Sequence, residues 1–478
     1  MTIPGRNRRK VTRVRLHDPA SVSINFLDSK QNVYEGQLWD YARYGFGIKL
    51  IDNLIHKRLD NIFNITISAF GSKKFVGNGK IMRITREEGF LLLGIYLENE
   101  FLDTDFLANN HSIYLQEDEI KTINLQFSYL YNIKSEFKCF TSDFAFGLST
   151  YKKQLDELDE KFKFEPPTLK NFLFQSTLNG IGKQFYLYLD REIEVLQKLV
   201  SAYSKIEHER HGFYIRKSLW NLIKHSGFMK RCITKPRGYP GDSVMMEMIY
   251  TQGYIGDSIF GKILHIHPVE LKAADAVRNR RKLINDEMEI CLKNNHEKEF
   301  KVLSVACGPA WEIQDFLKNS EYKHKVGLTL LDQDAEAINE AKKGIAKIET
   351  KQPFSVNFIQ ESVRVLLKTK EPSLNYGKFQ FIYSMGLFDY LTQPVAQAIA
   401  QKLYSMLSPE NGVLIIGNYH KKNESRIYME YLLDWVLFYR DEESMIELTE
   451  DFPGKFKTEI GFEPSGCQMF LKITREGS

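Results

Sequence analysis

From residue 299 onward, short apolar runs alternate with amphipathic segments, and this alternation restricts the fold more than any other feature of the chain. The apolar runs contain VLSV, LTLL, VNFI, FIYS and VLII. A glycine turn and WEIQDFL follow the first run, and AEAINEAKKGI, with helical spacing, follows the second. A parallel strand needs a crossover, usually a helix, before its parallel neighbour. Residues 299–478 are therefore predicted to form a doubly wound α/β sheet.

The rest of the chain shows two other periodicities. Over residues 1–105, apolar and polar residues alternate in short runs that glycines interrupt, which is typical of a small β-barrel; the alternating residues are Val22, Ile24, Phe26, Phe46, Ile48, Leu50, Ile65 and Ile67. Over residues 106–298 the spacing is helical. The sequence thus predicts a multidomain protein of mixed α+β and α/β class: a barrel over 1–105, a helical linker or lid region over 106–298, and a Rossmann-like domain over 299–478.

Composition excludes several classes of protein. The 65 basic and 61 acidic residues leave a net charge of only +4, which argues against a nucleic-acid partner. The five cysteines are scattered and form no Cys/His cluster, so we expect neither a metal site nor a disulfide framework. No apolar run is long enough to span a membrane, and the charged N-terminus lacks the apolar core of a signal peptide. A cytoplasmic location is predicted.

Two short motifs lie in the predicted barrel. Segment 6–15 contains six basic residues and no acidic one, which alone is typical of a solvated or nucleic-acid-touching tail. Further along, Asp40 precedes Gly45 by five residues, on a predicted turn that enters a strand. Arg9-Lys-Val-Thr-Arg13 and Asp40-Tyr-Ala-Arg-Tyr-Gly45 together resemble the RxxxR and (D/N)xSxxG signature of the PilZ domain, a receptor for cyclic di-GMP. VGNGKIMRI and LLLGIYLE resemble the closing strands of that family.

The PilZ resemblance implies that the barrel binds cyclic di-GMP through Arg8, Arg9, Arg13, Asp40, Ala42 and Gly45. Arginine forks suit both the phosphates and the O6 and N7 atoms of guanine, and an aspartate can accept from the guanine N1 and N2 donors. Ala42 replaces the usual serine, and the lost hydroxyl weakens binding by about 0.5–1.5 kcal/mol without abolishing it. The alternative is a degenerate barrel that serves for docking.

The start of the C-terminal region, VLSVACGPAWE, resembles the first motif of class I S-adenosylmethionine methyltransferases. Gly308 takes the central glycine position, Ala306 and Ala310 replace the flanking glycines, and Ser304 stands where many members have an acid. Asp332 ends the next predicted strand, where a carboxylate can hold the two ribose hydroxyls. A nicotinamide cofactor offers the same hydroxyls, so a dehydrogenase is the main competitor, but the first turn lacks the longer GxGxxG.

The methyltransferase resemblance implies further contacts with the cofactor. QFIYSMGLFDYL is similar to the fourth strand of the family, whose end lines the methionine side, and residues after the third strand neighbour the adenine. FKTEIGFEPSGCQMFLKITRE is similar to the closing antiparallel hairpin. Cys307 is interpreted as a packing residue because no histidine adjoins it. The predicted cofactor-binding residues are Ala306, Gly308, Pro309, Asp332, Gln333, Glu361, Ser362, Ser384 and Gly386.

KPRGYPGD, at residues 235–242, is the most unusual part of the middle region. Its two prolines and two glycines predict a fixed, non-helical loop, followed by a helix that Asp242 or Ser243 caps. We interpret the loop as a lid over the cofactor or substrate, and a plain structural turn is the alternative. Together with FIYSMGLFDYL, the loop resembles the 3-hydroxypalmitic acid methyl ester biosynthesis proteins over residues 170–478. That resemblance implies O-methylation of a 3-hydroxy fatty acid carboxylate.

A carboxylate acceptor needs no general base, because methyl transfer depends mainly on proximity and alignment. For an amine or hydroxyl acceptor, the candidate catalytic residues are Tyr239, Asp242 and His267, with Tyr419 as a further one. His267 stands on a predicted strand-like turn before Pro268, and a capping role is its alternative. Arg278, Arg280 and Arg281 are predicted to lie on a solvated helix face, and the alternative is that they receive a substrate carboxylate.

Together these features predict a cyclic di-GMP-responsive, S-adenosylmethionine-dependent methyltransferase that acts on a small acyl or carboxylate substrate. The predicted ligands are S-adenosyl-L-methionine as cofactor, cyclic di-GMP as regulatory ligand and a small-molecule substrate, and a homodimer is left open. The alternative function is a non-catalytic cyclic di-GMP signalling adaptor with a degenerate methyltransferase domain.

Overall fold

A computed structural model describes residues 14–15, 22–50, 60–69, 72–87, 90–98, 102, 104–322, 325–350 and 352–477. Contacts between Cα atoms divide the chain into two compact units, residues 1–131 and 132–478. The first unit contains the predicted barrel, and the second contains both the helical region and the C-terminal sheet. The finer division at residues 105 and 298 stays a prediction.

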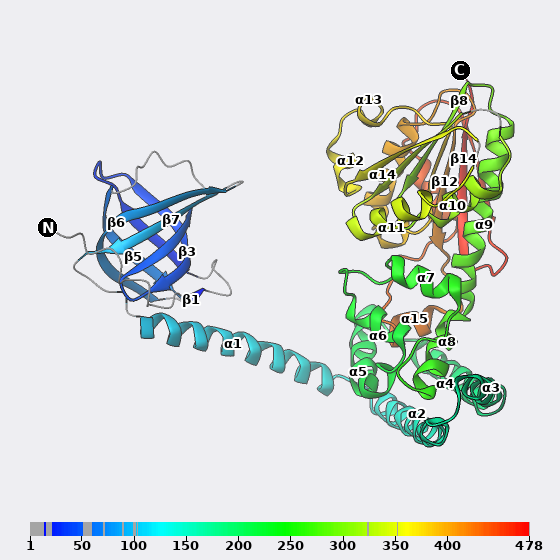
Figure 1. Cartoon of the computed structure of the whole chain (residues 1–478), viewed down its shortest axis with the longest axis horizontal. Coiled ribbons are helices and arrows are strands. Elements are labelled where there is room, and N and C mark those ends of the chain that lie inside the picture. The colour runs from blue at the N-terminus through cyan, green and yellow to red at the C-terminus, as the bar shows by residue number, and fades with distance from the viewer. Residues whose placement is uncertain are drawn as a thin grey trace. The chain divides into compact units, whose positions relative to one another are not determined.

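The first unit is a closed antiparallel barrel (Figure 1). Within the described residues, strands β3, β2, β5, β6, β7 and β4 follow one another around the sheet, and pairing of β4 with β3 closes it. The short β1 pairs with β3 from outside this ring. The strands are β1 (Val14–Arg15), β2 (Val22–Leu27), β3 (Val33–Ala42), β4 (Gly45–Leu50), β5 (Asn61–Ala69), β6 (Ser72–Glu87) and β7 (Phe90–Leu97).

The interior of the barrel confirms the alternation predicted from the sequence. All eight of the predicted inward residues, from Val22 to Ile67, are at most 1% exposed. Along β7 every second residue is buried, as expected for a strand with one face toward a core. Helix α1 (Thr104–Tyr131) follows, and Leu107 on its first turns packs into the barrel core.

The hairpin of β3 and β4 carries the second half of the PilZ-like motif. Asp40 was predicted on a turn, but it lies within β3, because the pairing of β3 with β4 continues as far as Ala42 and Gly45. Gly45 opens β4 and lies against β7. A Cβ atom on Gly45 would lie 2.4 Å from the carbonyl oxygen of Ile95, so this glycine is required where β4 meets β7.

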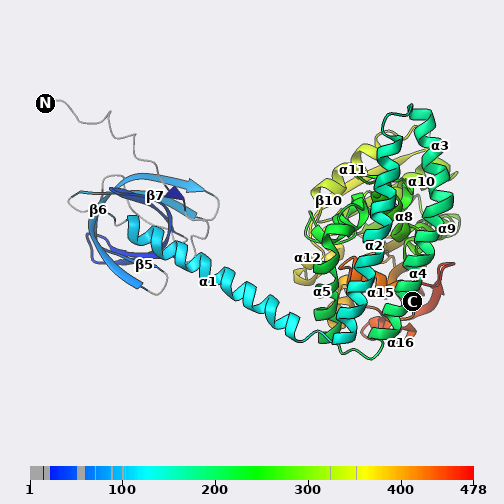
Figure 2. The ribbon, with the colours of Figure 1, turned by 90° about the horizontal axis from the view of Figure 1, so that it is seen from below.

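The second unit begins with packed helices that share one apolar core (Figures 1 and 2). A break in the charged helix was predicted at residues 165–167, and α2 indeed ends at Phe162 while α3 starts at Pro167. A π-helical turn, Leu178–Gly182, joins α3 to α4. The helices are α2 (Ser135–Phe162), α3 (Pro167–Thr177), α4 (Lys183–Val200), α5 (Lys205–Ile223), α6 (Gly227–Thr234), α7 (Ser243–Thr251), α8 (Ile259–Val269) and α9 (Lys272–Lys293).

One local prediction in this region is wrong. His265 and His267 lie inside α8 and not on a strand-like turn. Nearly every residue of α8 is buried, so its sequence shows no amphipathic period that would reveal a helix. Pro268 lies in the last turn of the helix, where it leaves one intrahelical hydrogen bond unmade and the helix ends at the next residue.

The C-terminal sheet has the order β10-β9-β8-β11-β12-β14-β13 within the described residues. The strands from β10 to β12 are parallel, and β14 pairs antiparallel with both β12 and β13. This confirms the doubly wound sheet and the closing hairpin. The strands are β8 (Glu299–Val305), β9 (Lys325–Asp332), β10 (Phe354–Gln360), β11 (Phe381–Ser384), β12 (Val413–Tyr419), β13 (Phe456–Phe462) and β14 (Gln468–Arg475).

Helices cover both faces of this sheet (Figures 1 and 2). On one face α9 packs with α10 (Trp311–Asn319) and α11 (Ala335–Ile345), and on the other α12 (Arg364–Lys368) packs with α14 (Gln393–Ser405). The remaining helices are α13 (Pro372–Tyr376), α15 (Arg426–Leu432) and α16 (Glu442–Ile446), with 3-10 turns at Phe388–Tyr390 and Glu447–Thr449. The chain order reverses between β8 and β11, and such a reversal opens a crevice at the carboxyl ends of the strands.

The helices of the described residues include none with the length and apolar composition needed to cross a membrane.

The contact between β4 and β7 yields a test of the barrel. Gly45→Ala should destabilise the barrel by about 1–3 kcal/mol, because the new methyl group has no room beside the Ile95 carbonyl. Hydrogen exchange followed by mass spectrometry should show faster exchange in β4 and β7 and unchanged exchange in the C-terminal sheet. Val33→Ala, at a 72% exposed position of β3, is the control and should leave exchange unchanged in both the barrel and the C-terminal sheet. Unaltered exchange in Gly45→Ala would contradict the packing described here.

Candidate functional site

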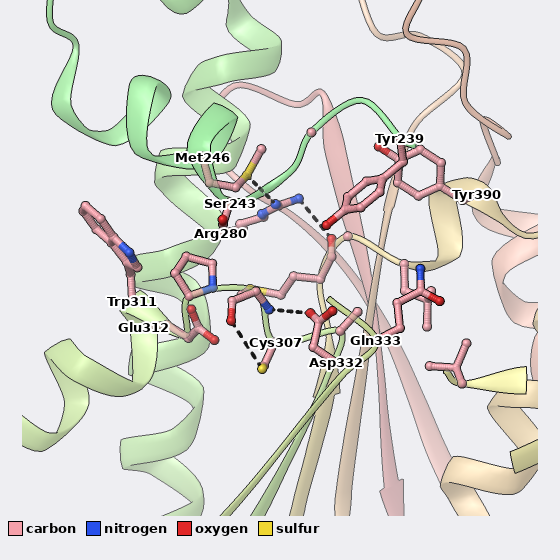
Figure 3. A pocket seen from close by; sticks show the side chains of 18 of the residues that line it. Tyr239, Ser243, Met246, Arg280, Cys307, Trp311, Glu312, Asp332, Gln333 and Tyr390 are labelled. Atoms are coloured by element: carbon pink, nitrogen blue, oxygen red, sulfur yellow. Dashed lines mark hydrogen bonds between the residues drawn. The ribbon is translucent and has the colours of Figure 1, made fainter. Parts of the chain in front are cut away.

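A cavity of about 280 Å³ lies at the carboxyl ends of the parallel strands, where the chain order reverses (Figure 3). The floor consists of the turns that follow three strands, at residues 306–309 after β8, 332–333 at the end of β9 and 385–387 after β11. The other walls come from the 235–242 loop, α7, α9 and the start of α10. Of the predicted site residues, Tyr239, Ala306, Gly308, Pro309, Asp332, Gln333 and Gly386 line this cavity.

The turn after β8 has the backbone shape of a glycine-rich turn although two of its positions are alanine. Ala306, Gly308 and Ala310 all adopt the left-handed conformation, with φ angles of 55°, 55° and 51°. This conformation costs an alanine roughly 1–2 kcal/mol, whereas glycine adopts it freely. A Cβ atom on Gly308 would meet no atom within 4 Å, so the space over this residue is open. The two alanines therefore keep the turn and leave room for a ligand above it.

Asp332 fixes this turn to the end of β9. Its carboxylate is 8% exposed and accepts hydrogen bonds from the backbone N–H groups of Gly308 at 2.8 Å and Asp334 at 2.9 Å. Each bond goes to a different carboxylate oxygen, so each oxygen keeps acceptor capacity toward the cavity. Burial raises the pKa of Asp332, and backbone hydrogen bonds from Asp334, Gly308 and Gln333 oppose this rise.

Among the predicted adenine and methionine neighbours, Gly386 lines the cavity. Glu361, Ser362 and Ser384 are not among its lining residues. Val363 lines the cavity, while the side chain of Glu361 accepts from Tyr376 at 2.6 Å and that of Ser362 from the N–H of Arg364 at 3.4 Å. Ser384 is fully buried, and its hydroxyl donates to the Val305 carbonyl at 3.0 Å, which ties β11 to β8. The sequence interpretation missed Val363 by one position, a shift that strand boundaries read from sequence commonly carry.

The 235–242 loop forms the opposite wall and is held down by several contacts. Arg237 pairs with Asp334, the N-cap residue of α11, at 3.0 Å and with Glu340 within α11 at 3.1 Å. The hydroxyl of Tyr239 donates to Asp334 at 3.1 Å, and Tyr390 donates to the Pro240 carbonyl at 3.1 Å. The loop is thus fixed and non-helical, as the sequence predicted, and it is joined to the residues that follow Asp332.

The candidate catalytic residues lie in different places. Tyr239 lines the cavity, and burial raises its pKa. Asp242 caps α7 by accepting from the N–H of Met245 at 3.0 Å, which confirms the predicted cap, and it also pairs with Arg231 at 2.7 Å. His267 contacts Asp190 at 3.0 Å and is not among the lining residues. The hydroxyl of Tyr419 donates to the Ala273 carbonyl at 2.6 Å, away from the lining residues.

Cys307 lines the cavity, but burial raises the pKa of its thiol well above the usual value. A neutral thiol is a poor nucleophile, which agrees with its interpretation as a packing residue. Across the part of the chain that the structure describes, no group of three or more His, Cys, Asp or Glu residues could hold a metal ion.

Two charged residues of the cavity were not assigned to it from the sequence. Arg280 on α9 was predicted on a solvated face, but it is buried and lines the cavity. Arg280 shares the buried face of α9 with Val277 and Ile284, at helical spacing. This spacing, which sets a charged residue in line with apolar ones, could have identified Arg280 as buried from the sequence. Glu312 in the first turn of α10 is also buried and lines the cavity. No pattern in its neighbourhood distinguished Glu312 from a surface acid.

Comparisons with known proteins find similarity in structure only. No family model matches the chain, and no curated protein matches it. Among solved structures, a possible exported protein from Bordetella parapertussis is 15% identical, over 64% of this chain and 97% of that one, with a TM-score of 0.40. Magnesium protoporphyrin IX methyltransferase from Synechocystis with bound SAH is 11% identical, over 42% and 86%, with a TM-score of 0.33. YcgR from Escherichia coli in complex with c-di-GMP is 15% identical, over 25% and 50%, with a TM-score of 0.19. At these identities no residue role carries over to this chain.

Proposed function

We propose that the second unit is an S-adenosylmethionine-dependent methyltransferase. The observation that carries the proposal is the joint geometry of Asp332 and the left-handed turn at residues 306–310. The turn leaves open space above Gly308, and Asp332 keeps acceptor capacity on both oxygens beside that space. A carboxylate at the end of the second strand, next to a tight turn, suits the ribose hydroxyls of an adenosine cofactor.

The residues of the cavity suit methyl transfer by proximity and orientation. S-adenosyl-L-methionine supplies an electrophilic methyl group on a sulfonium. Asp332 would accept from the ribose hydroxyls, and Gln333 and Val363, which line the same cavity, would neighbour the base. Gly386, without a side chain, keeps the space beside the end of β11 open. Tyr239 and Tyr390 line the cavity with aromatic rings.

The acceptor would enter from the helical region. Met246 and Tyr250 on α7 and Trp311 on α10 give this wall of the cavity an apolar and aromatic surface. Such a wall suits the hydrocarbon part of an acyl substrate, and a carboxylate acceptor needs no general base. This supports a small acyl or carboxylate substrate as the methyl acceptor. For a hydroxyl or amine acceptor, Tyr239 is the candidate that lines the cavity, with Asp242 and His267 as more distant proposals.

We expect Asp332→Ala to lower the affinity for S-adenosylhomocysteine by at least about 10- to 100-fold, since two charge-assisted hydrogen bonds to the ribose are lost. Calorimetry on the full chain measures this affinity. Asp286→Ala, which removes an exposed carboxylate from α9, should bind like the wild type. Equal affinities of wild type and Asp332→Ala would remove the basis of the cofactor assignment.

Turnover separates an enzyme from the alternative, a non-catalytic adaptor. With labelled S-adenosylmethionine and a 3-hydroxy fatty acid, the wild type should form the methyl ester and S-adenosylhomocysteine, and Asp332→Ala should not. The assay is run with and without cyclic di-GMP. A wild type that binds the cofactor tightly, but turns over neither with fatty acids nor with a cell extract, would favour the adaptor.

For the first unit we propose cyclic di-GMP as the regulatory ligand. Arg8, Arg9 and Arg13 lie outside the described residues, but the strand that follows them does not. In β1 the backbone of Arg15 pairs with Asp40 and that of Val14 with Tyr41. This pairing sets Arg15, the last residue of the basic segment 6–15, beside Asp40, which supports the proposal. The contacts of Ala42 and Gly45 with the ligand stay predictions. The same holds for a homodimer and for a cytoplasmic location.

Arg9→Ala and Arg13→Ala should each weaken cyclic di-GMP binding by about 1.5–3 kcal/mol, because each loses a charge-assisted contact. Titration calorimetry with the full chain gives the values. Arg86→Ala, at an exposed position of β6, removes one positive charge elsewhere on the barrel and should have little effect. Wild-type affinity in the Arg9→Ala/Arg13→Ala double variant would rule out this site.

A further inference from the structure

Two buried ionisable side chains, Arg280 and Glu312, line the same cavity without forming an ion pair with each other. Arg280 is 9% exposed and Glu312 is 4% exposed, and they come from different helices, α9 and α10. Among the described residues neither has an oppositely charged side-chain atom within 4.0 Å. The neighbouring Arg278 and Arg281 differ, because they pair with Asp275 and Asp315.

Arg280 is held by weak or neutral acceptors. Its guanidinium donates to the Met385 carbonyl at 3.1 Å, to the side-chain oxygen of Gln468 at 3.5 Å and to the sulfur of Met246 at 3.6 Å. Its buried Nε has no hydrogen-bond partner. A buried guanidinium without an anion is costly, and a carboxylate that accepts two parallel hydrogen bonds is the ligand that suits its geometry.

Glu312 has a neutral hydrogen-bond partner, while Arg280 and Arg281 act on it only through longer-range attraction. Its carboxyl accepts from the hydroxyl of Tyr383 at 2.7 Å. Burial raises the pKa of Glu312, and the Tyr383 hydroxyl and the charges of Arg280 and Arg281 oppose this rise. An ammonium group placed beside Glu312 would favour the carboxylate.

We infer that Arg280 and Glu312 hold the amino-acid end of the cofactor, with Arg280 on its carboxylate and Glu312 on its ammonium group; this inference rests on the proposed function. The placement supports it. Figure 3 shows Glu312 and Gln333 on opposite sides of the turn at Cys307, with Arg280 above it. Arg280 lies next to Gly386, where an added Cβ would be 3.4 Å from its nitrogens. The adenosine end at Asp332 and Gln333 therefore leaves the methionine end directed toward this pair.

The chemistry of the ligand matches what the two side chains lack. The α-carbon of methionine carries both an ammonium and a carboxylate, so one ligand can satisfy a buried cation and a buried acid together. A competing explanation for Arg280 is that it receives the carboxylate of the methyl acceptor. The two explanations differ in which ligand loses affinity when Arg280 is replaced.

Three nucleosides distinguish these cases by calorimetry on the full chain. S-adenosylhomocysteine carries both charged groups, its decarboxylated analogue carries only the ammonium, and 5′-methylthioadenosine carries neither. The proteins are wild type, Arg280→Gln, Glu312→Gln and the control Lys282→Gln, which removes an exposed charge from the same helix. Binding of 5′-methylthioadenosine reports that the cavity of each variant is intact.

Arg280→Gln should lower the affinity for S-adenosylhomocysteine by about 10- to 100-fold and leave the other two ligands unchanged. Glu312→Gln should lower the affinity for the two ligands that carry an ammonium and leave 5′-methylthioadenosine unchanged. Lys282→Gln should bind all three like the wild type.

Three results would overturn the inference in different ways. Equal weakening of all three ligands in Arg280→Gln would mean that this residue only supports the fold. Unchanged cofactor binding in Arg280→Gln, with a raised KM for the acceptor, would assign Arg280 to the acceptor. A wild type that binds none of the three nucleosides would refute the proposed function itself. A wild type that binds them, with unchanged binding in both Arg280→Gln and Glu312→Gln, would leave the function standing and refute only this inference.

Discussion

The carboxylate of Asp332 connects the parts of the second unit on which the cavity depends. One oxygen fixes the turn after β8 through Gly308, and the other fixes the start of α11 through Asp334. Asp334 in turn caps α11 and holds Arg237 and Tyr239 of the 235–242 loop. Burial acts to raise the pKa of Asp334, but backbone N–H groups and Arg237 hold it below the usual value, so this carboxylate is charged when it holds the loop. The floor and the cover of the cavity are thus joined through two neighbouring acids.

This connection accounts for a motif that departs from the usual glycine pattern. Alanine at positions 306 and 310 carries a conformational cost, because left-handed backbone is unfavourable for any residue with a Cβ. The hydrogen bond from Gly308 to Asp332 and that from Ala310 to the Cys307 carbonyl offset the cost and hold the turn in place. The turn is therefore set by its surroundings more than by the intrinsic preference of its residues.

The barrel depends on a different constraint, the closure of one sheet on itself. Closure brings β3 and β4 together and requires glycine where backbones approach closely, as at Gly45 and at Gly36, where a Cβ would lie 2.4 Å from Ile48. A glycine in the PilZ-like motif therefore has a structural reason that is independent of any ligand. The barrel also joins the end of the basic segment to Asp40, because the backbone of Arg15 pairs with that of Asp40.

The sequence by itself determined the elements whose burial is one-sided. AEAINEAKKGI predicted a helix that the structure gives as Ala335–Ile345, and the alternation from Val22 to Ile67 predicted the inward faces of the barrel. It also indicated the turn at Gly308 and the acid at Asp332, because these follow directly from strand ends. Only the tertiary structure decided what packs over each residue. It placed His267 in a helix buried on all sides, paired Asp242 with Arg231, and turned Arg280 from a surface charge into a wall of the cavity. The periodicity of a sequence indicates the side on which a segment is buried. The chemistry of a buried charge depends instead on partners that are distant in the chain. These partners meet only when the helices and the sheet pack together.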